Sequence, residues 1–84
     1  MMESIGEKVS IVFVYQARDG SLFPRKMQWK NREYRMTKLG YHHAAWQGKI
    51  LMHYFHVTDG STDFRLCLNT QTLHWVLEYV SYGT

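Results

Sequence analysis

The chain has 84 residues, of which 45% are hydrophobic and 15% aromatic, and its formal net charge is +3. This composition excludes a disordered or low-complexity protein and is typical of one small globular domain. The single cysteine, Cys67, excludes an internal disulfide and favours a reducing compartment. No signal peptide and no run of roughly 20 apolar residues is visible. We therefore expect a cytoplasmic protein without membrane association, with one domain at 1–84 that is ordered over about residues 8–80.

Apolar and polar residues alternate with a period of two along most of the chain, which is the pattern of β-strands. Six segments show this alternation: 9–17, 23–30, 33–43, 50–57, 63–69 and 73–80. Turn signals separate several of them, and β-branched and aromatic residues outweigh helix formers. The sequence therefore predicts an all-β protein, a six-stranded antiparallel meander that forms a small barrel or a strongly bent sheet.

The region after the turn at Asn31-Arg32 is the least regular part of the predicted sheet. Tyr34 and Met36 point inward, but Leu39 falls out of phase with them, which a bulge near Gly40 would correct. Residues 42–49 are interpreted as an irregular connection or a strand end, and part of this segment could form one helical turn. The sequence therefore does not decide the conformation of the connection between the third and fourth predicted strands.

Large side chains supply the predicted core. Trp29, Trp46 and Trp75 are all interpreted first as core residues, because each ring buries a large apolar area. Two segments, 9–15 and 50–57, are apolar on both faces. Such surface has to be covered within the domain or by a partner, which favours a homodimer.

Residues 25–38 contain six of the ten Lys and Arg residues and one acid, Glu33, so their local charge is +5. The six cations are Arg25, Lys26, Lys30, Arg32, Arg35 and Lys38. Such clustering is what a phosphate backbone requires, and Tyr41 or Trp46 could stack on exposed bases. The period of two, however, places Trp29 and Tyr34 on the face opposite the lysines. The same pattern therefore fits a solvated outer face.

Histidine and cysteine are the remaining candidates for chemistry. The five histidines, at positions 42, 43, 53, 56 and 74, lack the spacing of a zinc site, so we expect no metal. Cys67 has no sequence motif that would provide a base or an oxyanion hole. Glycines occur singly at turns, without a nucleotide-binding pattern. We therefore expect no catalytic residue and no cofactor.

Several short motifs recur in one order along residues 24–80. They are Pro24, Met27-x-Trp29, Arg32-Glu33-Tyr34, Trp46, Phe55-x-Val57, Phe64-x-Leu66 and Trp75-x-Leu77. In this order the chain resembles small uncharacterised bacterial β domains with a P-x-x-(apolar)-x-W-x-G-R-x-Y hairpin and a final W-x-L strand. Asn31 stands where those domains usually have Gly. The resemblance implies an all-β fold and assigns no activity.

These observations favour a non-enzymatic interaction module that binds an as yet unidentified protein or associates with itself. The alternative is a nucleic-acid-binding small β-barrel that uses the basic hairpin at 25–38 for weak, electrostatic binding. A hydrolase or metalloprotein that uses the histidines is a third hypothesis, for which the sequence offers no motif.

Overall fold

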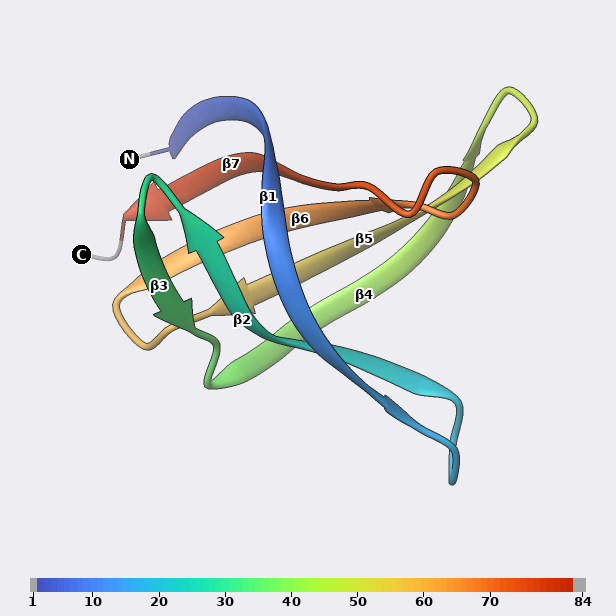
Figure 1. The fold of residues 1–84 in the computed structure, drawn as a ribbon, viewed down its shortest axis with the longest axis horizontal. Helices are drawn as coiled ribbons and strands as arrows, with labels where there is room; N and C mark the ends of the chain where they lie inside the picture. Colours follow the sequence, from blue (N-terminus) through green and yellow to red (C-terminus); the bar gives the residue numbers. More distant parts are fainter. Residues whose placement is uncertain (1, 83–84) are drawn as a thin grey trace.

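The computed structural model describes residues 2–82, which form one antiparallel sheet of seven strands. The strands are β1 (Met2–Gln16), β2 (Ser21–Trp29), β3 (Arg32–Arg35), β4 (Lys38–Gln47), β5 (Ile50–Thr58), β6 (Thr62–Asn69) and β7 (Trp75–Tyr82). Their order is β3-β2-β1-β7-β6-β5-β4 (Figure 1). The predicted all-β, antiparallel class is confirmed, but there are seven strands rather than six. Within residues 2–82 the sheet is not closed into a barrel.

The seventh strand arises because the predicted strand at 33–43 is divided at Met36 and Thr37. The backbone N–H of Met36 donates to the carbonyl oxygen of Arg25 on β2 at 2.8 Å. The N–H of Thr37 donates instead to the carbonyl oxygen of Thr58 on β5, also at 2.8 Å. The chain therefore leaves one side of the sheet and joins the other within two residues. As a result β3 and β4, which are consecutive in the chain, form the two opposite edges.

The longest strand, β1, connects the two parts of the bent sheet. Its first half pairs with β7 from Met2 to Val9, and its second half pairs with β2 from Ser10 to Gln16. A register shift at Phe13, opposite the buried Pro24, bends the β1–β2 hairpin. In Figure 1 the β1–β2–β3 part crosses over the layer of β4 to β7.

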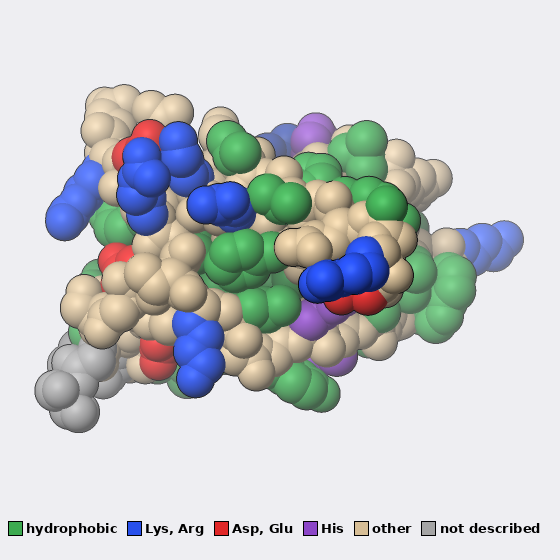
Figure 2. All heavy atoms as spheres, turned by 90° about the horizontal axis from the view of Figure 1, so that it is seen from below, with side chains coloured by type: hydrophobic (Ala, Val, Ile, Leu, Met, Phe, Trp, Pro, Cys, Tyr) green, Lys and Arg blue, Asp and Glu red, His purple; other side chains and the backbone are tan. Residues whose placement is uncertain are grey.

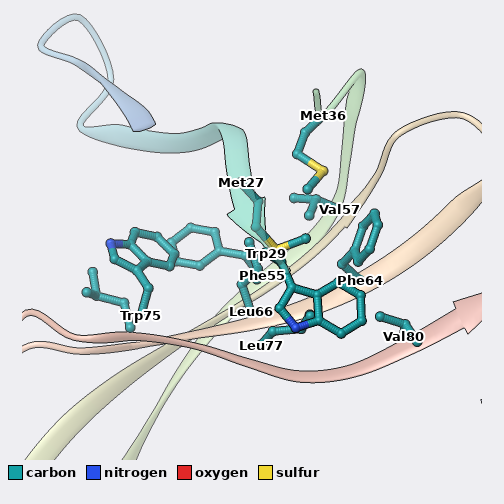
Figure 3. Close-up of a cluster of buried hydrophobic side chains, with 11 residues drawn as sticks. Met27, Trp29, Met36, Phe55, Val57, Phe64, Leu66, Trp75, Leu77 and Val80 are labelled. Atoms are coloured by element: carbon teal, nitrogen blue, oxygen red, sulfur yellow. The ribbon is translucent and has the colours of Figure 1, made fainter. Parts of the chain in front are cut away.

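The core lies between these two parts. Eleven buried side chains form it: Met27, Trp29, Met36, Phe55, Val57, Phe64, Leu66, Leu68, Trp75, Leu77 and Val80. Figure 3 shows the side chains of β2 directed at those of β5, β6 and β7. Trp29 and Trp75 are buried, at 8% and 7% exposure, as the sequence predicts. Trp46 is 69% exposed, so its interpretation as a core residue is wrong.

The segment interpreted as an irregular connection belongs to β4, which runs regularly to Gln47. The predicted bulge is present, since the register shifts between Leu39 and Tyr41, around Gly40. The β4–β5 turn contains Gly48 at φ 60°. Asn31, in the β2–β3 turn, also has a φ of 60°. Asn tolerates this left-handed conformation better than most residues, so the β2–β3 turn can form without Gly.

The described part of the chain contains no helix that could cross a lipid bilayer.

Candidate functional site

The basic hairpin borders an open depression of about 400 Å³ on the β1–β2–β3 side of the sheet. Three of its six cations line this depression: Arg25, Lys26 and Arg35. The remaining lining residues are Val12, Val14, Met36 and Thr37. We call this set of seven residues the cationic depression. Figure 2 shows Lys and Arg side chains beside a central area of hydrophobic side chains on one face of the molecule.

Backbone pairing explains why these cations converge. Lys26 and Arg35 are direct cross-strand partners on β2 and β3, so their side chains leave the sheet side by side. Arg25 is held beside them because its carbonyl oxygen accepts the N–H of Met36. Glu33 supplies a compensating charge, with its Oε2 3.4 Å from Nε of Arg35. Both of these side chains are more than half exposed, so water screens the pair and the depression keeps a positive potential.

Two other predicted cations, Lys30 and Arg32, lie at the turn of the hairpin. The Nζ of Lys30 is 4.9 Å from the ring centroid of Trp29, and the guanidinium carbon of Arg32 is 5.1 Å from that of Tyr34. The expectation that rings and charges occupy opposite faces is therefore wrong at this turn. Lys30 has a φ of 54°, which reverses the chain and interrupts the strand alternation. Its charge lies over a core ring, whose face attracts a cation.

The last three predicted site residues all belong to β4, and the structure does not bring them together. Lys38 begins the strand. Tyr41 is paired with His56, whereas Trp46 is paired with Leu51. Because side chains alternate along a strand, Tyr41 and Trp46 project from opposite faces of β4. The predicted eight-residue site is therefore divided among the cationic depression, the hairpin turn and β4.

The outer face of β5 to β7 carries a network that sequence reasoning missed. The guanidinium of Arg65 lies over the rings of Tyr54 and Tyr79, at 4.7 and 5.7 Å, and its Nε is 2.9 Å from Oε1 of Glu78. A register shift beside Arg65 brings Tyr79 to this face, whereas simple alternation predicts the core face. His43 stacks on Tyr54 at 5.0 Å. These contacts immobilise the face, so we interpret it as structural.

Two histidines meet on the core-facing side of β4 and β5, near the end of the sheet. The Nε2 atom of His42 lies 2.8 Å from the Nδ1 atom of His53. The ring of His42 also stacks on Phe55, with centroids 4.2 Å apart and planes inclined by 5°. Burial, followed by the proximity of His53, lowers the pKa of His42 below its usual value. Among residues 2–82, no three His, Cys, Asp or Glu side chains form a set that could hold a metal ion.

Cys67 lies on β6 opposite Tyr54 and is only 3% exposed. Burial raises the pKa of its thiol, so the reactive thiolate is disfavoured. The side chain therefore acts as a small apolar residue in the packing of the sheet.

The two edges of the sheet differ in how they are protected against pairing. The β3 edge has only four residues, and three of them, Arg32, Glu33 and Arg35, are charged. The β4 edge has ten residues, and from Leu39 to Gln47 it contains no Lys, Arg, Asp or Glu. In β4 only Leu39 and His43 are half-buried, and the other side chains are exposed. Short length and charged side chains are the usual features that prevent an edge strand from pairing with another chain. By these criteria β3 is protected against such pairing and β4 is not.

Comparison with protein-family models, with curated proteins and with solved structures gives no significant match. Function therefore has to follow from the chemistry of the chain's own surfaces. Two surfaces are distinctive enough for this purpose, namely the edge of β4 and the cationic depression.

Proposed function

We propose that the protein is a small, non-enzymatic interaction module that associates with a second copy of itself through the edge of β4. The observation that carries this proposal is the contrast between the two edges. One is short and mostly charged, whereas the other is long and has no Lys, Arg, Asp or Glu from Leu39 to Gln47. Every second residue of an edge strand directs its N–H and C=O away from the sheet. A strand from another chain can satisfy these groups by continuing the ladder.

A second copy is the partner that fits this edge. Two copies of β4 can pair antiparallel around a two-fold axis, which is the commonest symmetry of oligomers. The segment from Leu39 to Gln47 contains no Lys, Arg, Asp or Glu, so such a pair places no like charges of these residues opposite one another. Tyr41 and Trp46 are 59% and 69% exposed, and pairing would remove part of their apolar surface from water.

Sedimentation equilibrium with two matched variants tests the proposal. Ala45→Lys adds a charge to the unprotected edge, whereas Ala17→Lys adds the same charge at the β1–β2 turn, and both alanines are exposed. The proposal predicts that the native protein and Ala17→Lys dimerise at micromolar concentration and that Ala45→Lys is shifted toward monomer. A native protein that is only monomeric would contradict it, as would equal association of all three proteins.

The absence of a catalytic motif from the sequence and the low reactivity of Cys67 support a binding role rather than an enzymatic one. The buried thiol also supports a reducing, cytoplasmic setting, since it has no partner cysteine in the sequence.

The cationic depression favours a second candidate function, weak binding of single-stranded nucleic acid. Arg25, Lys26 and Arg35 present three positive charges together, and a phosphate backbone would release counterions on meeting them. Among residues 2–82, no aromatic side chain lines the depression. We therefore propose electrostatic binding without base stacking, indifferent to sequence. The dependence of affinity on salt concentration tests this candidate.

A further inference from the structure

The pair of histidines on β4 and β5 is a site that neither candidate function uses. We propose that His42 and His53 bind a divalent transition metal ion that favours square-planar nitrogen coordination, Cu²⁺ or Ni²⁺, with water completing the coordination. The inference does not depend on self-association, since both ligands come from one chain.

The distance between the two ring nitrogens carries the inference. Nε2 of His42 and Nδ1 of His53 are 2.8 Å apart. Two nitrogens that bind one ion at about 2.0–2.1 Å are about 2.9 Å apart as neighbours in a square plane, and about 3.4 Å apart in a tetrahedron. The observed separation is that of a hydrogen bond between the rings. It is also close to the square-planar value, so the two nitrogens already have nearly the spacing that Cu²⁺ or Ni²⁺ requires of neighbouring nitrogen ligands. Binding would replace the hydrogen bond between the rings, and each ring would keep its proton on the other nitrogen.

The surroundings hold the two rings in place and leave them accessible. His42 is stacked flat on Phe55, which restricts its rotation. The residue opposite His53 on β4 is Ala44, whose side chain is too small to cover the pair. The site is open to water on the surface of the sheet.

Titration of the metal-free protein with CuCl₂ and with NiCl₂ at neutral pH tests the inference. The native protein should bind one ion per chain, and the electron paramagnetic resonance spectrum of the Cu²⁺ form should show coupling to two imidazole nitrogens. His42→Asn and His53→Asn should each weaken binding by about tenfold or more, because each removes one of the two protein ligands. His74→Asn removes an exposed histidine that lies outside the pair and should leave the affinity unchanged.

An affinity that is unchanged in His42→Asn or His53→Asn would overturn the inference. An equal loss in His74→Asn would also overturn it, because it would show general binding by surface histidines. Circular dichroism checks that each variant folds. A measurement on the native protein needs no variant: substoichiometric Cu²⁺ should broaden the backbone amide resonances of His42, Ala44 and His53 first. Broadening centred elsewhere would contradict the site.

Discussion

The indole N–H of Trp29 on β2 donates a hydrogen bond to Oε1 of Glu7 on β1, and the donor and acceptor atoms are 3.1 Å apart. This contact connects residues 22 positions apart and satisfies the polar atom of a ring that is otherwise in the core. It also fixes the position of β2 relative to the part of β1 that pairs with β7.

Removal of either partner should destabilise the fold, but to very different extents. Trp29→Ala deletes a buried ring and should lower the free energy of unfolding by roughly 3–5 kcal/mol. Glu7→Ala keeps the ring and loses one hydrogen bond, so it should cost only about 1 kcal/mol. Urea denaturation measures both values, with Glu33→Ala as a control for the loss of an exposed carboxylate from β3. A loss below about 1 kcal/mol for Trp29→Ala would mean that the ring is not buried.

The other two tryptophans should behave in opposite ways. Trp75 is buried against Phe55, with ring centroids 5.3 Å apart, so Trp75→Ala should cost roughly 3–5 kcal/mol. Trp46 is 69% exposed, and Trp46→Ala should change the stability of the monomer by no more than about 0.5 kcal/mol. Denaturation at low protein concentration measures both. Equal losses at the two positions would contradict the exposed placement of Trp46.

Binding of nucleic acid, if it uses the cationic depression, should depend on salt in a defined way. Each phosphate contact with a single strand contributes about −0.7 to the slope of log affinity against log salt, so three contacts give a slope of about −2. Lys26→Gln and Arg35→Gln should each reduce the magnitude of this slope by about one contact's share. Fluorescence anisotropy with a labelled oligonucleotide measures the slope. Lys49→Gln, which removes a cation from the β4–β5 turn, is the control. If Lys49→Gln also reduced the slope by the share of one phosphate contact, the cationic depression would not be the binding site. The same conclusion would follow if no binding were detected at low salt.

Stability should decrease in weak acid because of His42 and His56. Burial lowers the pKa of both side chains below the usual 6.5. The folded state therefore binds fewer protons than the unfolded state in this range, so stability is full above pH 6.5 and falls as the pH decreases toward the folded pKa values. Urea midpoints measured from pH 8 to pH 5 test this. The decrease should be smaller in His42→Asn, and a midpoint that rises on acidification would show that the sign is wrong.

The sequence predicts the fold where strand alternation is unbroken, as in β5, β6 and most of β2. It fails where the backbone departs from a regular ladder. The division of the predicted strand at Met36 depends on two hydrogen bonds to other strands, and no local sequence pattern indicates these bonds. The exposure of Trp46 follows from the edge position of β4, which only the complete strand order determines.

The candidate site was predictable only in part for the same reason. The convergence of Lys26 and Arg35 follows from hairpin pairing and could be read from the sequence. The meeting of His42 with His53 depends on the exact register of β4 and β5 beyond a bulge at Gly40. A shift by one residue would direct these two rings to opposite faces.

Hydrogen exchange of the β4 backbone amides, measured by nuclear magnetic resonance at increasing protein concentration, tests self-association through this edge most directly. In the monomer, alternate amides of β4 bond to β5 and the others face water. If two copies pair through β4, the water-facing amides between Leu39 and Gln47 should become protected as the concentration rises, and Ala45→Lys should abolish this change. Exchange of these amides at the rate of free peptide at every concentration would contradict pairing through β4, as would concentration-dependent protection on another strand.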